Sequence, residues 1–380
     1  MMSIFSPRTL KLIVGSSLER SSVRSAAAFT CPSSNFRVRR SSITASIPMS
    51  SSSNTDPFSL SGKTALVTGS SGGIGKGIAK TFAEAGADVI VHYNTRREGA
   101  ISTFKEINDK YAAASVELGK TNGSDVKSPG KCLGIIQADF RDPKAVDAMF
   151  QFVTNEILKD NRLDVLVNNA GIVTKLAVED DDDLSAWHET MAVNLHAPLQ
   201  LMKLAHAHMK SATPQGGDAS DDKERGGGVI INNTSIHGSR SVEYMTAYAA
   251  SKAALDSLTR GLACEYAPDG VRVNAIAPGV VPVERTAEAL SNPGATEMWT
   301  PHLPLGRLGN VEDVARATLT LATNEWMSGT VLTVDGGMMA RANMPIRPRP
   351  PKPESMAGGN ATEGGEGELA SSGVSFEVPT

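Results

Sequence analysis

The chain has 380 residues, of which 40% are hydrophobic and 21% are charged, an ordinary composition for a globular protein. No apolar run approaches the roughly 18 residues that cross a bilayer, which excludes a membrane-spanning role, and no membrane partner is expected. Cys31, Cys132 and Cys264 are scattered, so the sequence predicts neither a disulfide framework nor a metal site. The formal net charge is −4, and residues 1–55 account for +6 of it, which leaves −10 for the rest. An acidic body argues against a nucleic-acid partner.

Residues 1–55 form a segment rich in Ser and Arg, with Glu19 as its only acid. This composition predicts a disordered leader of the kind that directs proteins into an organelle. The stretch 26–29 (AAAF) resembles a plastid cleavage site, which favours a chloroplast or another plastid over a mitochondrion. The alternative is a plain disordered tail, in which case the protein is cytoplasmic.

From Lys63 onward, short β-branched runs alternate with longer amphipathic stretches. The pattern predicts a strand at 64–68, a helix at 74–85 and a strand at 88–92. This alternation is typical of a parallel sheet with crossover helices, so we expect an α/β fold, a single doubly wound Rossmann domain over 60–340 with helices on both faces. Further strands are predicted at 133–137, 163–168, 229–232, 272–277 and 331–334. Solvated loops are expected at 112–131 and 213–228, and a disordered tail at 341–380.

A glycine-rich turn, residues 68–75 (TGSSGGIG), lies between the first predicted strand and the first helix. Glycines there let the backbone approach a pyrophosphate, and the positive end of the helix stabilises its charge. The strand and helix context is the one that the motif requires. The sequence therefore predicts dinucleotide binding through Thr68, Gly69, Ser71, Gly73, Ile74 and Gly75.

The second predicted strand is followed by 93–97 (YNTRR), where an enzyme selective for NAD usually carries an acidic side chain for the ribose 2′-hydroxyl. An arginine would instead attract a 2′-phosphate, so NADP(H) is the favoured cofactor, with NAD possible. Asn94 and Arg96 are the predicted contacts. The alternative is that Arg96 and Arg97 are ordinary solvated loop charges.

Tyr248 and Lys252 are four residues apart, so a helix places them on one face. A phenol has a pKa of about 10, and a neighbouring ammonium favours its ionised form. Ser235 ends the run 230–234 (IINNT), and a hydroxyl at the carboxyl end of a strand lies where doubly wound sheets bind ligands. Asn194 lies in a predicted helical stretch, where a buried Asn is more often structural than catalytic.

Taken together, these motifs resemble the short-chain dehydrogenase/reductase family, and the resemblance covers 60–337. It implies hydride transfer between a nicotinamide cofactor and a carbonyl or alcohol carbon, a small-molecule substrate, and a homodimer or homotetramer. It further implies that Tyr248 exchanges the proton, Ser235 holds the substrate oxygen, Lys252 assists the phenol and binds the ribose, and Asn194 organises a water relay. The cofactor contacts implied by the resemblance are Asp139 at adenine, then Asn169, Ala170, Gly171, Tyr248, Lys252, Pro278, Gly279 and Val281.

The chain departs from the family pattern at two positions. Members often carry Thr five residues after the Pro of the Pro-Gly pair, where this chain has Val283, with Thr286 three residues later. In the family this segment meets the carboxamide of the nicotinamide, and Val283 has no hydroxyl for that contact. Many NADP-dependent members also carry a basic residue where this chain has Gly72, which weakens the NADP assignment without removing it.

The substrate is much less visible in the sequence. One alternative is a glucose or polyol dehydrogenase, in which His237 and Glu284 would serve as polar partners. A 3-oxoacyl-acyl-carrier-protein reductase of fatty-acid synthesis fits the leader and the stretch 304–307 (PLGR) equally well. A more remote alternative is a nucleotide-sensing scaffold without enzymatic activity. Such a protein would have no physical need for the tetrad formed by Asn194, Ser235, Tyr248 and Lys252.

Overall fold

The structure is a computed structural model of the chain. It describes residues 56–118, 128–159, 161–211, 227–284, 286, 294 and 299–341. The predicted leader, nearly all of the predicted tail and most of the predicted loop at 213–228 lie outside the described residues. The predicted domain limits therefore stay predictions.

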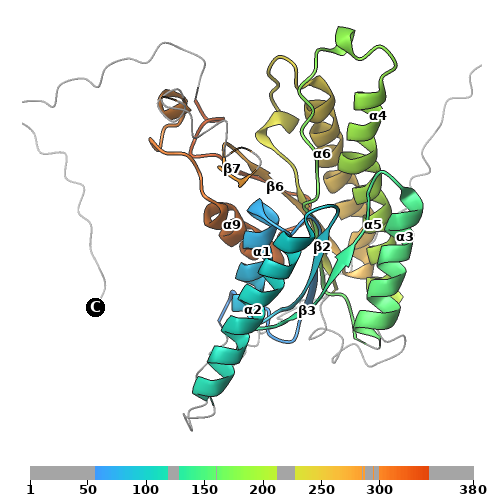
Figure 1. Cartoon of the computed structure of the whole chain (residues 1–380), viewed down its shortest axis with the longest axis vertical. Coiled ribbons are helices and arrows are strands. Elements are labelled where there is room, and N and C mark those ends of the chain that lie inside the picture. Colours follow the sequence, from blue (N-terminus) through green and yellow to red (C-terminus); the bar gives the residue numbers. More distant parts are fainter. Residues whose placement is uncertain are drawn as a thin grey trace, which may run out of the picture. The chain divides into compact units, whose positions relative to one another are not determined.

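The described residues contain a single seven-stranded sheet in the order β3-β2-β1-β4-β5-β6-β7, and every pairing is parallel (Figure 1). The strand order reverses between β1 and β4, and open α/β sheets bind ligands outside the carboxyl ends of the strands at such a point. The predicted fold class is confirmed. The strands are β1 (Thr64–Val67), β2 (Asp88–Tyr93), β3 (Cys132–Gln137), β4 (Val165–Asn168), β5 (Val229–Asn233), β6 (Arg272–Pro278) and β7 (Val331–Val334).

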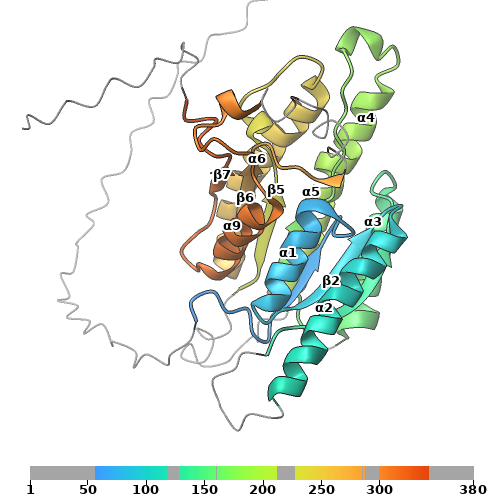
Figure 2. The same ribbon diagram turned by 60° about the vertical axis from the view of Figure 1, so that its left-hand side comes forward.

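Helices cover both faces of the sheet (Figures 1 and 2). Successive residues of a strand point to opposite faces. Leu66 of β1 packs into the core under one set of helices, whereas its neighbour Val67 packs into the core under the other. This burial on both sides explains why the strands read as continuous apolar runs. One face carries α3 (Pro143–Phe152), α5 (Ala197–Ser211) and α6 (Thr246–Tyr266), and the other carries α1 (Gly73–Glu84), α2 (Arg97–Leu118) and α9 (Val311–Thr323).

Two helical features differ from the sequence prediction. The loop expected at 112–131 is wrong at its start, because α2 continues to Leu118, and residues 111–118 (YAAASVEL) contain three alanines, the best helix former. The predicted helical stretch around Asn194 is divided into α4 (Ser185–Met191), a wider π-helical turn at Ala192–His196 and α5. Such turns are frequent at functional sites.

Candidate active site

The glycine turn follows β1 and packs tightly against the end of β4. Gly69 has φ of +64° and Gly73 has φ of +53°, a region of backbone conformation that favours glycine. A Cβ on Gly69 would lie 2.8 Å from the Cα of Ala170, and one on Gly75 would overlap the Asn169 amide. Side chains are therefore excluded from this cradle, and the bare backbone fits a pyrophosphate.

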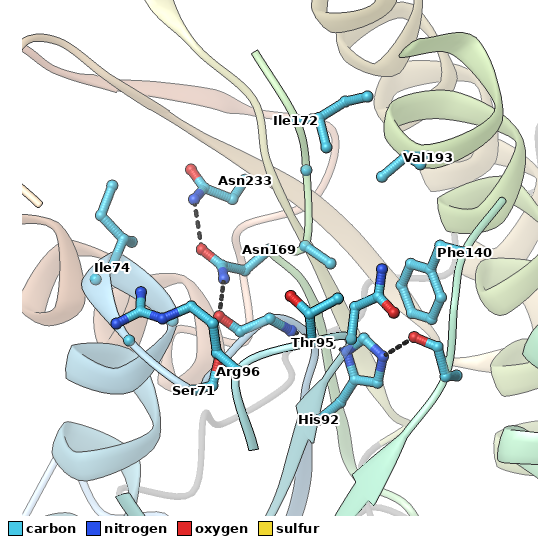
Figure 3. A pocket seen from close by; sticks show the side chains of 18 of the residues that line it. Ser71, Ile74, His92, Thr95, Arg96, Phe140, Asn169, Ile172, Val193 and Asn233 are labelled. Atoms are coloured by element: carbon cyan, nitrogen blue, oxygen red, sulfur yellow. Dashed lines mark hydrogen bonds between the residues drawn. The ribbon is translucent and has the colours of Figure 1, made fainter. Parts of the chain in front are cut away.

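Hydrogen bonds tie the turn to the neighbouring strand ends. The Thr68 hydroxyl accepts from the backbone amides of Asn169 (2.9 Å) and Ala170 (3.0 Å). The Asn233 amide donates to Asn169 Oδ1 at 2.7 Å (Figure 3). Asn169 Nδ2 donates to the carbonyl of Thr68 at 2.8 Å. Thr68 is 1% exposed, so its hydrogen bonds lie beneath the turn and hold it in place.

A cavity of about 810 Å³ opens above the turn, at the carboxyl ends of β1 to β4. A dinucleotide needs a site of this size. Thr68, Tyr248, Lys252, Pro278, Gly279 and Val281 were predicted as cofactor contacts but do not line this cavity. The predicted residues that do line it are Gly69, Ser71, Gly73, Ile74, Gly75, Asn94, Arg96, Asp139, Asn169, Ala170 and Gly171.

The two predicted arginines separate at this cavity. Arg96 lines it, and its Nη1 lies 3.7 Å from Glu284 Oε2, whereas Arg97 begins α2 and is not among the lining residues. Across the cavity, Asp139 is held by Arg141, whose hydrogen bonds lower the pKa of that carboxyl. The Asp139 carboxylate therefore stays charged at neutral pH.

His92 is a cavity residue that the sequence analysis missed. Its Nδ1 accepts from the Gly69 amide (3.0 Å), so the ring proton is on Nε2, which donates to the Ala138 carbonyl at 3.1 Å (Figure 3). The ring stacks on Phe140 with centroids 4.4 Å apart. Burial lowers the pKa of His92 to about 4, so the imidazole is neutral at physiological pH. The only signal in the sequence was one polar residue within the apolar run of β2.

The four residues predicted as a tetrad gather at the ends of β4 and β5. Lys252 Nζ donates to the carbonyl of Asn233 at 2.8 Å and lies 5.7 Å from the centroid of the Tyr248 ring. A Cβ on Gly171 would lie 3.1 Å from Asn194 Oδ1 and 3.6 Å from Lys252 Nζ. Gly171 thus marks the point where the cofactor cavity meets the ammonium.

Asn194 is fully buried, and its amide group holds the segment that follows β4. Its Oδ1 accepts from the Ile172 amide (2.8 Å), and its Nδ2 donates to the Ile172 carbonyl (2.9 Å). Nδ2 also lies 3.2 Å from the Ser251 hydroxyl. These bonds give Asn194 the structural role that a buried helical Asn often has.

Ser235 follows β5, and its Oγ accepts from the amide of His237 at 3.2 Å. The His237 ring meets the Tyr248 ring edge to face, with centroids 6.0 Å apart. Burial lowers the pKa of His237, so this side chain is neutral at physiological pH. The site thus combines a hydroxyl, a phenol, a neutral imidazole and an ammonium beside a cavity shaped for a dinucleotide.

Asp256 is a second residue that the sequence analysis missed. It lies one helical turn beyond Lys252 on α6 and is 5% exposed. Its Oδ2 faces the backbone of Gly238, and burial raises the pKa of its carboxyl. An aspartate in a helix gives no sign in the sequence that it will be buried.

In the part of the chain that the structure describes, no cluster of His, Cys, Asp and Glu could hold a metal ion, and no helix is long and apolar enough to span a bilayer. The groups at the site can hold and move a proton, whereas a hydride must come from a bound cofactor. The fold and the site together define the Rossmann class of dinucleotide-dependent oxidoreductases.

Comparison with known proteins identifies the family within this class. Residues 69–339 match the family model described as enoyl-(acyl carrier protein) reductase. The chain is 33% identical over 288 residues to 2-dehydro-3-deoxy-D-gluconate 5-dehydrogenase of Bacillus subtilis, covering 75% of this chain and 98% of that protein. It is 34% identical over 281 residues to 3beta-hydroxysteroid dehydrogenase 1 of Eggerthella lenta, covering 73% and 94%.

The solved structures agree. A gluconate 5-dehydrogenase from Burkholderia cenocepacia in complex with NADP and tartrate superposes with a TM-score of 0.62 at 26% identity, over 76% of this chain and 99% of that one. The chain belongs to the short-chain dehydrogenase/reductase family. It is an oxidoreductase that uses NAD(P) to interconvert a carbonyl and an alcohol.

Proposed function

We propose that the protein is an NADP-dependent dehydrogenase of a small polyhydroxylated substrate, in the class of sugar acids and polyols. The single observation that carries the cofactor choice is Arg96, which lines the cofactor cavity where β2 ends without an acidic side chain. A guanidinium at this position attracts the 2′-phosphate of NADP. The 2′-hydroxyl of NAD is usually bound by an acidic side chain, which this position lacks. The NADP in the Burkholderia relative supports the same choice.

The cofactor choice is tested by titrating NADPH and NADH into the wild type and into Arg96→Ala. We expect the wild type to bind NADPH more tightly than NADH. We expect Arg96→Ala to lose about 10- to 150-fold in NADPH affinity while its NADH affinity changes little, because a charge-assisted contact to phosphate contributes about 1.5–3 kcal/mol. Equal affinities in the wild type would refute the preference.

The proposed chemistry assigns one step to each polar group. The bound cofactor supplies or accepts the hydride. In the reducing direction Tyr248 gives its proton to the carbonyl oxygen, which Ser235 holds by a hydrogen bond. Lys252, buried and held at the Asn233 carbonyl, keeps a positive charge beside the phenol ring that stabilises the phenolate. Asn194 holds the backbone at Ile172 next to both groups.

The substrate class is supported by two of the relatives, which are named for gluconate-type sugar acids, and by the polar character of the site around His237. The test is a panel of sugar acids, polyols, hydroxysteroids and 3-oxoacyl thioesters, followed at the nicotinamide absorbance. We expect kcat/KM to be highest for a sugar acid or polyol. Higher values for a 3-oxoacyl thioester or a hydroxysteroid would overturn this substrate class and leave the tetrad chemistry in place.

Assembly and location complete the proposal. We infer a homodimer or homotetramer, because β7 is an edge strand of the sheet and natural proteins seldom leave such an edge bare. We also infer that residues 1–55 direct import into a plastid, an inference supported only by their composition.

A further inference from the structure

An acidic side chain lies in the cofactor cavity at the glycine turn. Glu284, from the segment after β6, is a lining residue of the cavity, and its Oε2 lies 3.7 Å from Nη1 of Arg96. A Cβ on Gly72 would lie 2.9 Å from both Glu284 Oε1 and Arg96 Nη1. The carboxylate and the guanidinium therefore meet on the glycine turn itself, where Figure 3 shows the Arg96 side chain.

A hydrogen-bonded turn presents this carboxylate. The Thr286 hydroxyl accepts from the Val283 amide (3.0 Å) and donates to the Val283 carbonyl (3.1 Å), and the Thr286 amide donates to the same carbonyl at 2.8 Å. A Cβ on Gly73 would lie 3.2 Å from the Val283 side chain. Glu284 is thus held in the second position of a turn that packs on the cradle. The hydroxyl of Thr286, displaced from the family position, is used to hold this turn.

The position is one that an anion favours. The turn leads into the positive end of α1, and Arg96 adds a full positive charge. A cofactor brings its own anions to this place, the pyrophosphate at the turn and, in NADP, the 2′-phosphate at Arg96. Two anions cannot share one guanidinium at this distance without repulsion, so the Glu284 carboxylate and the 2′-phosphate compete for Arg96.

We propose that Glu284 is an internal competitor for the 2′-phosphate of NADP and thereby sets how tightly, and how selectively, the enzyme binds NADP. The inference rests on the proposed use of NADP. Before NADP binds, Glu284 neutralises Arg96, and the 2′-phosphate must displace the carboxylate from the guanidinium. NAD lacks that phosphate, so it leaves the Arg96–Glu284 pair largely intact. Glu284 therefore weakens NADP binding more than NAD binding.

A double-mutant cycle on Glu284→Gln and Arg96→Ala tests the proposal in the full-length protein. The Kd values of NADPH and NADH are measured by nicotinamide fluorescence without substrate. We expect Glu284→Gln to bind NADPH about three- to fivefold more tightly and NADH less than twofold more tightly, in line with an exposed ion pair of up to about 1 kcal/mol. In the Arg96→Ala background the same change should bring little gain.

The matched control is Glu98→Gln, which removes one negative charge from an exposed position two residues after Arg96. We expect the control to change the Kd of NADPH by less than twofold. Equal gains for Glu284→Gln and Glu98→Gln, an equal gain with and without Arg96, or no gain at all would each overturn the proposal. If Arg96→Ala weakens NADPH while Glu284→Gln does nothing, only this inference fails. If Arg96→Ala leaves NADPH binding unchanged, the proposed cofactor preference fails with it.

Discussion

At the scale of single residues, the site separates groups that can transfer a proton from groups that hold the backbone. Both nitrogen-bearing neighbours of Tyr248 are fixed: Lys252 donates to the Asn233 carbonyl, and His237 Nδ1 lies 3.2 Å from the Arg240 carbonyl. The ammonium and the imidazole therefore approach the phenol from set directions. The proton donor is therefore held in position before substrate and cofactor bind. Catalytic groups contribute most to the rate when they are preorganised in this way.

Replacing Tyr248 with Phe tests the proton donor directly. The change removes one hydroxyl and keeps the ring that packs near His237 and Lys252. We expect kcat to fall by about 10²- to 10⁴-fold, the usual contribution of general acid–base catalysis, while the Kd of NADPH stays within about twofold. Tyr244→Phe is the matched control, because Tyr244 is 64% exposed and lies in the turn just before α6, the helix that carries Tyr248. Ordinary turnover in Tyr248→Phe would refute the assigned role.

His92 makes the fold sensitive to acid. Its pKa falls from an unfolded value of 6.5 to about 4 in the fold, so the unfolded chain takes up its proton first as the pH decreases. Stability is therefore lost between pH 6.5 and 4, and the loss from this group is on the order of 3 kcal/mol. In urea unfolding, His92→Gln should be less stable at pH 7 but should lose about 1.4 kcal/mol less per pH unit within this window. An unchanged pH slope would contradict this, and His188→Gln, which alters an exposed histidine, should keep the wild-type slope.

Much of the candidate site could be predicted from the sequence, because glycines at a strand-to-helix junction and a Tyr–Lys pair at helical spacing carry local signals. Gly69 and Gly73 have the positive φ that such a turn requires. His92 and Asp256 could not be predicted, and Glu284 was expected to contact the substrate and not to lie against Arg96, because each of these positions depends on contacts between segments far apart in the chain. His92 bonds to Ala138, and Glu284 lies against Arg96, almost 190 residues earlier.

At the scale of helices and strands, the buried strands were the most predictable. The expected strand at 229–232 is β5 with one residue more, and the one at 88–92 is β2 with one residue more. Apolar β-branched runs buried on both faces admit few other structures. The end of α2 had a local signal in its three alanines that the prediction did not use. The π-helical turn at Asn194 was not predictable, because turn width depends on hydrogen bonds such as those to Ile172.

Arg272 joins the sheet to the end of α9, and this contact can be tested. From β6 its guanidinium donates to the carbonyls of Leu321 (2.9 Å), Ala322 (2.7 Å) and Met327 (2.8 Å). The carbonyls at a helix end have no partner within the helix, so the arginine satisfies groups that would otherwise be unpaired. Burial lowers the pKa of Arg272 but leaves it charged.

We expect Arg272→Met to lower the free energy of unfolding by about 2–4 kcal/mol, because it leaves buried carbonyls unsatisfied. Arg272→Lys should recover part of this, since an ammonium cannot reproduce the planar fork. Chemical denaturation measures both, with Arg316→Met on the exposed side of α9 as the control. A loss no larger than that of the control would show that the carbonyls find other partners.

At the scale of the whole molecule, the two faces of the sheet are covered by helices, and the two edges remain. One edge is β3, and the other is β7, which pairs only with β6 among the strands described. The side chains of Val331, Leu332 and Val334 are partly buried, and that of Thr333 is exposed. A second copy of β7 alongside the first would satisfy the free backbone groups of this edge in a two-fold arrangement.

The last prediction tests this assembly with a chain that spans Asn54 to Arg341. We expect it to fold, to retain activity and to form a dimer or tetramer in light scattering, because the described core lies within these limits. Thr333→Arg should shift it toward the monomer, since two charged side chains would face each other across the two-fold axis. Ala112→Arg, an exposed change on α2, should leave the assembly intact. An active monomer of the shortened wild-type chain would refute the assembly, and an unaltered oligomer in Thr333→Arg would move the interface away from β7.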